Sequence, residues 1–239
     1  MQRLLRAVFP PQCIGCGDMV ESEGALCGPC WRDTRFITGV VCDCCGSPLM
    51  GEVVEGETLY CDECLEGRRV WDRGRAAFLY KDTGRKLVLA LKHGDRLDVV
   101  KPAAEWMSRA AEEIVDDDTI VAPIPLHWTR FMKRRFNQSA LLSKEIANNL
   151  HLEHVPELLR RVKRTQSLEG QTAGKRRKTL SNAIMPHPKY WQRMEGRSVL
   201  LVDDVLTTGA TINAAARACI ASLASEVNVI ALARVERDG

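Results

Sequence analysis

Two parts of this sequence contain residues whose types and spacing suit chemistry. The first is a set of four Cys-x-x-Cys pairs, and the second is the segment 199–211, which reads VLLVDDVLTTGAT. A Cys-x-x-Cys turn points two thiolates at one place, and two such turns complete a tetrahedral four-cysteine zinc site. Paired carboxylates followed by a turn into a helix suit a phosphorylated sugar, because a helix N-terminus binds anions and carboxylates accept hydrogen bonds from hydroxyl groups.

The cysteine pairs predict two structural zinc ions. Eight of the ten cysteines form these pairs, all within the first 64 residues: Cys13/Cys16, Cys27/Cys30, Cys42/Cys45 and Cys61/Cys64. Disulfides do not suit a reducing compartment, and a redox centre needs one such pair near a βαβ unit, not four. Sequential pairing is the simpler topology, but spacing leaves open a cross-braced one, with the first pair joined to the third. It also leaves open whether Cys44 competes as a ligand.

The segment 199–211 has the chemistry of a ribose phosphate site. Four apolar residues predict a buried strand, with Asp203 and Asp204 at its carboxyl end. A glycine and hydroxyl side chains then enter a helix, which makes a cradle for a phosphate group. The residues expected to bind the ligand are Asp203, Asp204, Thr207, Thr208, Gly209, Ala210 and Thr211. A phosphate beside a vicinal diol indicates a ribose 5-phosphate.

The elements that must position these residues alternate between strands and helices. Apolar patterning predicts strands over 119–125, 198–203 and 227–233 and helices over 82–93, 101–115, 139–150 and 210–223. Residues 160–182 are polar and basic, and we expect a long mobile loop there. Such alternation predicts an α/β fold with a parallel sheet and flanking helices, in which ligands bind past the carboxyl ends of the strands.

Composition and charge restrict the function further. The chain has 239 residues, 45% hydrophobic and 27% charged, which is typical of a globular protein. Residues 1–66 have four basic and eleven acidic residues, a balance of −7, whereas residues 130–178 have thirteen basic and four acidic residues, a balance of +9. The acidic first segment disfavours nucleic-acid binding by the cysteine-rich part. The basic middle favours a phosphate-rich partner.

The same data suggest a division into two domains. We expect a small double zinc-ribbon domain over residues 1–66, in which metal replaces an apolar core, and a second domain over residues 67–239. The sequence has no apolar run of about 18 residues and no secretory h-region, so it predicts a cytoplasmic protein without membrane insertion.

The motifs also resemble a known family. Residues 199–211 are similar to the PRPP (phosphoribosyl pyrophosphate) motif of type I phosphoribosyltransferases. The wider chain resembles the ComF family of competence proteins, which join a double zinc ribbon to a phosphoribosyltransferase-like domain. The family's motifs occur in its order: the four cysteine pairs, Tyr80, LKHGD at 91–95, PIPL at 123–126, FNQ at 136–138 and the PRPP motif.

The resemblance implies roles for particular residues. Asp203 and Asp204, the candidate catalytic residues, would contact the ribose hydroxyls, and the turn that follows would hold the 5-phosphate. Residues near the pyrophosphate would be Arg130, Lys133 and Arg134, and the loop 161–178, with Arg164 and Arg176, would be a hood that closes during turnover. Mg²⁺ would accompany PRPP as the cofactor.

Two functions of different classes follow. The first is a phosphoribosyltransferase that binds PRPP–Mg²⁺ and transfers phosphoribose to an unknown acceptor with release of pyrophosphate. The second is a non-enzymatic protein that binds single-stranded DNA, or other competence proteins, and keeps the PRPP-binding fold. The process implied by the family is natural competence and DNA uptake. A purely structural zinc-ribbon adaptor would not explain the complete PRPP motif.

Overall fold

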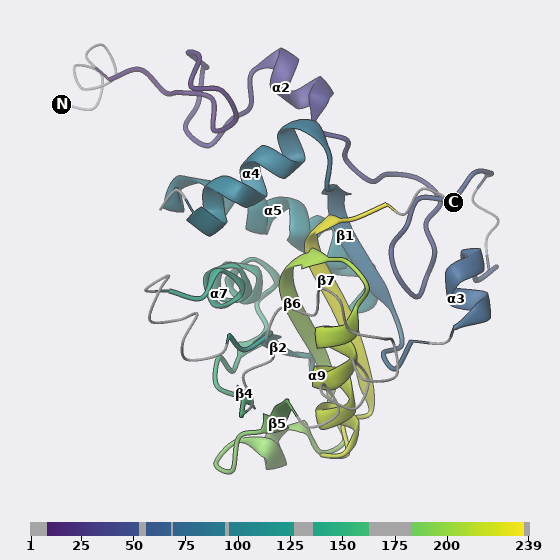
Figure 1. Cartoon of the computed structure of the whole chain (residues 1–239). Coiled ribbons are helices and arrows are strands. Elements are labelled where there is room, and N and C mark those ends of the chain that lie inside the picture. The colour runs from purple at the N-terminus through teal and green to yellow at the C-terminus, as the bar shows by residue number, and fades with distance from the viewer. Residues whose placement is uncertain are drawn as a thin grey trace, which may run out of the picture.

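The computed structural model describes residues 9–52, 56–67, 69–93, 96–126, 136–162 and 183–236 (Figure 1). Its central feature is a five-stranded sheet in the order β1-β7-β6-β2-β3, with every neighbouring pair parallel. The strands are β1 (Gly74–Leu79), β2 (Ile120–Pro123), β3 (Glu153–His154), β6 (Ser198–Leu206) and β7 (Glu226–Arg234). The expected α/β fold with a parallel sheet is confirmed.

Helices cover both faces of the sheet (Figure 1). One face packs against α4 (Asp82–His93), α5 (Val100–Ala111) and α7 (Gln138–Leu150), and the other packs against α9 (Ala210–Ile220). Strand β6 supplies both cores by strict alternation: Leu200 and Val202 join the first, and Val199 and Leu201 join the second. Side chains of successive strand residues point to opposite faces, so an unbroken apolar run is what a doubly covered strand requires.

The expected helices are present with shifted ends, and one strand is longer than expected. The predicted helix over 101–115 ends earlier as an α-helix and continues as the 3₁₀ turn η2 (Glu112–Ile114), while η1 (Leu97–Val99) precedes α5. The predicted strand over 198–203 was too short, because β6 runs to Leu206. Its last residues pair with β7, where Leu206 lies opposite Arg234. Cross-strand pairing thus extends the strand beyond its apolar run.

A two-stranded antiparallel sheet lies outside the main sheet and was not predicted. It pairs β4 (Leu159–Arg161) with β5 (Ile184–Pro186) in antiparallel register, and η3 (Trp191–Met194) follows it. The expected mobile loop over 160–182 overlaps β4, and its residues 163–182 lie outside the described part of the chain.

The cysteine-rich segment is anchored on the free edge of β1. Its short helices are α2 (Gly28–Asp33) and α3 (Asp62–Glu66), which lie at separate places around the sheet (Figure 1). Between them, Phe36 bridges to Phe78, and the amide of Ile37 donates to the carbonyl of Ala77. The Phe36 ring also lies 5.2 Å from the Trp106 ring of α5, centroid to centroid. The chain between the two cysteine groups therefore packs into the aromatic part of the core.

A partly buried ion-pair network reinforces this attachment. Arg75 of β1 pairs with Asp43 at 2.8 Å and with Glu113, and Arg73 pairs with Asp43 at 3.1 Å. Although burial opposes it, hydrogen bonds from Arg75 and Arg73 hold the pKa of Asp43 below its ordinary value. Opposite charges close to a carboxylate favour its ionised form, so the network links Asp43 to the sheet.

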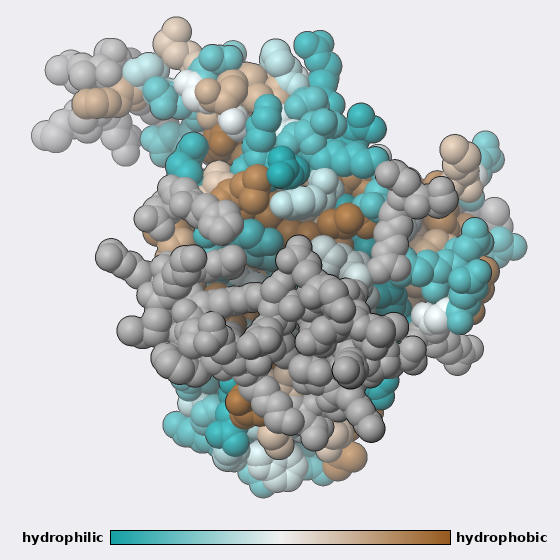
Figure 2. Space-filling model, in the orientation of Figure 1, coloured by the Kyte–Doolittle hydropathy of each residue, from teal (hydrophilic) through white to brown (hydrophobic). Residues whose placement is uncertain are grey.

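None of the described helices has the length and apolar character needed to cross a bilayer. On the face shown in Figure 2, hydrophilic and hydrophobic residues of the described part are interspersed.

Asn228 satisfies two backbone groups inside the fold, which makes it a test of the architecture. Its side-chain amide donates to the carbonyl of Ile114 at 2.7 Å, and its side-chain oxygen accepts from the amide of Arg73 at 3.1 Å.

We expect Asn228→Ala to lower the free energy of unfolding by roughly 3 kcal/mol, because both buried groups lose their partner. Chemical denaturation measures this. The control Asn148→Ala, on the exposed face of α7, should change it by less than about 0.5 kcal/mol. Equal losses for both variants would contradict the assignment.

Candidate functional site

The predicted ligand-binding residues lie at the carboxyl end of β6 and in the turn into α9. Since β6 lies between β2 and β7, this end of the strand is at the middle of the sheet edge. Gly209 ends the turn with a φ of +73°, in the left-handed region that favours glycine, and caps α9. Thr207 and Thr208 are exposed, whereas Gly209 is buried. The fold thus brings the two acids and the hydroxyl-rich turn together.

The two acids have different surroundings. Asp203 accepts hydrogen bonds from the hydroxyl of Ser139 at 3.1 Å and from the amide of Asp204 at 2.9 Å. Asp204 faces the ammonium of Lys92, with Oδ1 and Nζ 3.2 Å apart. Burial, together with the neighbouring charge of Asp204, raises the pKa of Asp203 to about 7. Asp204 is therefore paired with a cation, whereas Asp203 takes up a proton as the pH falls through about 7.

The start of α7 borders the same edge. Asn137 accepts from the amide of Ser139 at 3.2 Å and so caps the helix, and its side-chain amide donates to the carbonyl of Ile124 at 3.2 Å. These contacts bring the predicted PIPL and FNQ motifs to the end of β6.

Sequence reasoning missed Lys92 and Ser139 as members of this site. Lys92 lies inside the LKHGD motif, and Ser139 follows FNQ, so both were next to quoted motifs. The available signal was that two adjacent, partly buried acids require a compensating cation and a hydrogen-bond donor.

The predicted pyrophosphate and hood residues lie outside the described residues. These are Arg130, Lys133 and Arg134, in the gap 127–135, and Arg164 and Arg176, in the gap 163–182. Their roles stay predictions.

Two buried arginines lie behind the turn and were also missed. Arg69 donates to the carbonyl of Thr208 at 2.6 Å, and Arg234 donates to the carbonyls of Leu206 at 3.2 Å and Thr207 at 3.0 Å. Neither is in a recognisable motif. Arg234 occupies the last position of β7, directly after the apolar run 229–233, and only the sheet register shows that it lies opposite Leu206.

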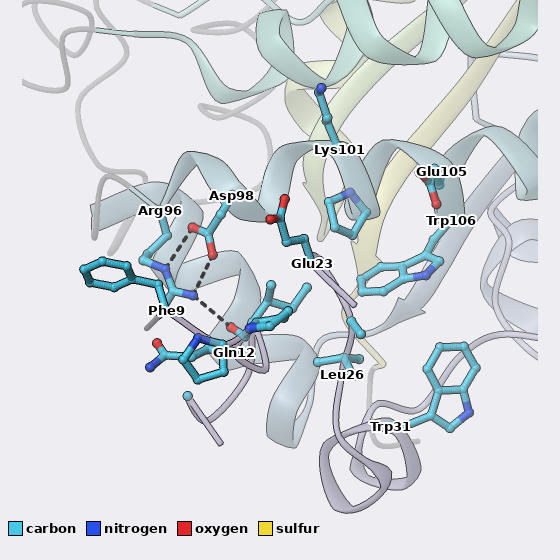
Figure 3. A pocket seen from close by; sticks show the side chains of 17 residues that line it. Phe9, Gln12, Glu23, Leu26, Trp31, Arg96, Asp98, Lys101, Glu105 and Trp106 are labelled. Carbon is cyan, nitrogen blue, oxygen red and sulfur yellow. Dashed lines mark hydrogen bonds and ion pairs between the residues drawn. The ribbon is translucent and has the colours of Figure 1, made fainter. Parts of the chain in front are cut away.

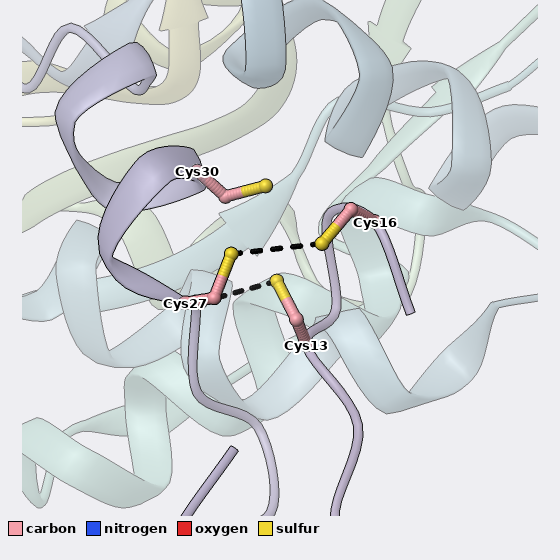
Figure 4. A group of neighbouring side chains, drawn as sticks. All are labelled: Cys13, Cys16, Cys27 and Cys30. Atoms are coloured by element: carbon pink, nitrogen blue, oxygen red, sulfur yellow. Dashed lines mark hydrogen bonds between the residues drawn. The ribbon is translucent and has the colours of Figure 1, made fainter. Parts of the chain in front are cut away.

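The eight paired cysteines form two separate four-sulfur groups. Cys13, Cys16, Cys27 and Cys30 make the first (Figure 4), and Cys42, Cys45, Cys61 and Cys64 make the second; within each group all sulfur atoms lie within 4.8 Å of one another. The pairing is therefore sequential and not cross-braced. Cys44 is buried but belongs to neither group, and its carbonyl accepts from the indole of Trp71 at 2.6 Å.

The geometry of both groups fits zinc. Zn–S bonds of about 2.3 Å in a tetrahedron place the sulfur atoms about 3.8 Å apart. The sulfurs of Cys16 and Cys27 are 3.6 Å apart in the first group, and those of Cys45 and Cys61 are 3.6 Å apart in the second. In the second group, the hydrogen bond from Cys42 and the charge of Arg234 lower the pKa of Cys45 to about 3, so this sulfur is a thiolate ready to bind metal. Four thiolates leave no open position on zinc, which makes both sites structural.

A groove of about 1050 Å³ lies between the first cysteine group and α5 (Figure 3). Trp31, which is half exposed, and Trp106 lie along it. Its cations are Arg96, which is paired with Asp98 at 2.7 Å, and Lys101, whereas Asp98, Glu23 and Glu105 supply three acids. The groove therefore lacks the net positive charge that a phosphate ligand needs.

Comparison with known proteins agrees with these features. Residues 4–65 match the family described as double zinc ribbon domain. The chain is 27% identical over 232 residues to competence protein F of Haemophilus influenzae, covering 95% of this chain and 98% of that protein. It is 28% identical to DNA utilization protein YhgH of Escherichia coli K12, covering 87% and 90% of the two chains. It is 26% identical to competence protein ComFC of Bacillus subtilis, covering 83% and 79%.

Some solved structures overlay part of the chain. Glutamine PRPP amidotransferase from B. subtilis does so with a TM-score of 0.40 and 15% identity, covering 60% of this chain and 30% of that one. Adenine phosphoribosyltransferase from Thermoanaerobacter pseudethanolicus does so with a TM-score of 0.37 and 19% identity, covering 58% and 82%. No conclusion about this chain depends on these partial overlaps.

These features define a class of protein in which a double zinc ribbon precedes a parallel α/β sheet with acids and a glycine turn at the end of a central strand. The resemblance to the ComF family of competence proteins is confirmed by relatives that match over most of the chain.

Metal content tests the two cysteine sites. We expect metal analysis of the purified chain to find two zinc ions per molecule, one for each four-sulfur group. Cys45→Ser should lose one of them, because it removes a ligand of the second group. The matched control Cys44→Ser should keep both. Equal zinc loss in the two variants would show that the ligand set is wrong.

The raised pKa of Asp203 predicts how stability depends on pH. The folded-state pKa of about 7 lies above an unfolded value of about 3.9, so the folded chain binds this proton more tightly. The stability that this proton adds is complete below about pH 4 and is lost as the pH rises through 7. Asp203→Asn should therefore be more stable than the wild type at about pH 8, by at most ~4 kcal/mol, and equal to it near pH 4.

Thermal unfolding at both pH values measures the effect. Asp98→Asn is the control of opposite sign, because the hydrogen bond from Arg96 lowers the pKa of Asp98. That variant should lose stability relative to the wild type as the pH rises above about 4. An Asp203→Asn variant that is less stable than the wild type at the higher pH would contradict the assignment.

Proposed function

We propose that this protein binds PRPP with Mg²⁺ and transfers its phosphoribosyl group to a nucleophilic acceptor, releasing pyrophosphate. The observation that carries the proposal is the placement of Asp203, Asp204 and the turn 207–211 together at the carboxyl end of the central strand β6. In open parallel sheets this is where ligands bind. The acids suit a vicinal diol, and the turn suits a phosphate.

The turn would hold the 5-phosphate of the substrate. The hydroxyls of Thr207, Thr208 and Thr211 are donors, and α9 begins at Ala210 with its positive dipole end towards this position. Gly209 allows close approach of the backbone to a phosphate oxygen, since it has no side chain and adopts the left-handed conformation.

The acids would hold the ribose. Asp204 accepts hydrogen bonds from the ribose hydroxyls when Lys92 releases it, and the freed ammonium of Lys92 then lies where it can neutralise substrate phosphate oxygens. Asp203 keeps its bond from Ser139 and fixes the position of the neighbouring acid through the amide of Asp204. Carboxylate oxygens fit Mg²⁺, which supplies charge neutralisation for the pyrophosphate when bound.

The transfer itself needs positioning more than covalent chemistry. The bond between C1 of the ribose and the pyrophosphate oxygen breaks, and the electron pair leaves with pyrophosphate. The lone pair of the acceptor forms the new bond to C1, and the acceptor loses a proton. The contribution of the protein is to align the two reactants and to stabilise the separating charges.

A second candidate function is binding of single-stranded DNA. The relatives include a competence protein and a DNA utilization protein, and these names support a process that involves DNA. The basic stretch 130–178 suits a DNA backbone as well as a pyrophosphate. We rank it second because the carboxylates of Asp203 and Asp204 would repel a DNA backbone.

Calorimetric titration of PRPP–Mg²⁺ tests the proposal. We expect the wild type to bind and Asp203→Asn/Asp204→Asn to lose affinity by a factor of at least about 100, because the charge-assisted contacts of Asp204 to the ribose hydroxyls are removed together with the carboxylate of Asp203 that positions it. The matched control is Asp117→Asn/Asp118→Asn, which changes two adjacent aspartates in an exposed turn and should bind as the wild type does.

Two results would overturn the proposal. One is equal PRPP affinity of the wild type and of Asp203→Asn/Asp204→Asn. The other is a folded wild type that does not bind PRPP but binds a single-stranded oligonucleotide with an affinity that falls steeply with salt, which would establish the second candidate.

A further inference from the structure

The second cysteine group lies directly behind the phosphate turn, and two buried guanidinium groups join them. We propose that Arg69 and Arg234 are positioning residues through which the metal site formed by Cys42, Cys45, Cys61 and Cys64 holds the turn 206–209 in its binding conformation. The effect on PRPP affinity rests on the proposed function, whereas the effect on the order of the turn does not.

Arg234 connects the two features from the sheet. Its Nη1 donates to the carbonyls of Leu206 and Thr207, at 3.2 and 3.0 Å, at the point where β6 ends. Its Nη2 faces the sulfur of Cys45 at 3.7 Å and a carboxylate oxygen of Glu63 at 3.6 Å. The side chain is only 3% exposed. One planar cation thus touches both the sulfur cluster and the turn.

Arg69 connects them from the segment that follows the ribbon. Its Nη1 donates to the carbonyl of Thr208 at 2.6 Å, and its Nη2 pairs with the other oxygen of Glu63 at 2.9 Å. Glu63 lies between the third and fourth ligands of the second group in the sequence, so the metal site holds it in place.

Trp71 completes the contact by packing. Its indole lies under the guanidinium of Arg69, 5.4 Å from ring centroid to Cζ, and its Nε1 donates to the carbonyl of Cys44. A Cβ added at Gly209 would lie 2.5 Å from the Trp71 ring and 2.9 Å from Arg69 Nη1. The turn therefore packs against these two side chains so closely that a side chain at position 209 would not fit.

Charge explains why the arginines depend on the metal. Four thiolates and one Zn²⁺ carry a net charge of −2, and together with Glu63 they more than offset the charge of the two buried guanidinium groups. Loss of the metal releases the four sulfur atoms from their common centre, so the anionic cluster beside the arginines is no longer held in place. A buried cation without its anions is strongly unfavourable, so we expect both side chains to leave their positions and to release the three carbonyls of the turn.

The first cysteine group provides an internal control. It packs elsewhere, where the hydroxyl of Thr83 in α4 donates to Asp33 of α2 at 2.7 Å and Arg96 reaches the carbonyl of Ile14. Loss of metal from this group removes an equal charge but leaves the Arg69 and Arg234 contacts in place.

The experiment compares Cys61→Ser with Cys16→Ser, each of which removes one ligand from one group. Zinc content should fall by one ion in both variants. Amide hydrogen exchange of residues 206–211 should become at least about tenfold faster in Cys61→Ser and stay unchanged in Cys16→Ser, because only the first loses the charge that holds the arginines. PRPP affinity should fall by roughly tenfold in Cys61→Ser alone.

A second set of variants tests the arginines with both metal sites intact. Arg69→Met and Arg234→Met keep much of the side-chain volume and lose the charge, and each should accelerate exchange of the same residues while zinc content stays at two ions. Arg73→Met is the control, because Arg73 is bound to Asp43 and to the carbonyl of Glu113 instead. Thermal unfolding identifies any variant that fails to fold.

The outcomes separate this proposal from the proposed function. Unchanged exchange of residues 206–211 in Cys61→Ser and in both arginine variants would overturn the positioning role, as would equal acceleration in Cys16→Ser and Cys61→Ser. If the wild type does not bind PRPP, the proposed function fails, but the exchange measurements still decide whether the metal site holds the turn.

Discussion

The parallel pairing of β6 with β2 on one side and with β7 on the other determines where the functional groups lie. Because β6 is covered on both faces, its apolar residues leave no space for a polar side chain until the strand reaches the sheet edge. Asp203 and Asp204 are the first polar residues after that run. The same register brings Arg234 of β7 opposite Leu206 and so behind the turn. Backbone pairing thus places the acids in front of the turn and the cation behind it.

The site is built from charges that the fold balances locally. Asp204 is paired with Lys92, Asp203 is bonded by Ser139, and the arginines behind the turn face Glu63 and the second cysteine group. Such buried polar groups need partners, because an unpaired one costs much of its solvation energy. The negative charge of Asp203 is the one in this group that its neighbours do not fully offset, and the pKa of Asp203 is therefore raised. It lies where a cationic or hydroxylic ligand would offset it, which is common at binding sites.

The cysteine-rich part supplies rigidity where the chain has few apolar residues. Its two four-sulfur groups are joined by a segment that pairs with the edge of β1, so each group is attached to the α/β part at its own place. The second group lies against the turn after β6, and the first lies against α4 and η1. Metal binding can then influence the edge of the sheet, although no cysteine is part of the candidate ligand site.

The sequence by itself determined the local features. Four Cys-x-x-Cys turns, the apolar run before Asp203 and the turn residues up to Thr211 depend on neighbours along the chain, so type and spacing were enough to predict zinc ligation, the buried strand and the helix that follows. Tertiary structure alone decided which groups meet across the chain. The sequential cysteine pairing, Lys92 beside Asp204, and Arg69 and Arg234 behind the turn bring together residues that are far apart in sequence. Strand register and charge balance set those contacts, and neither leaves a periodic signal in the sequence.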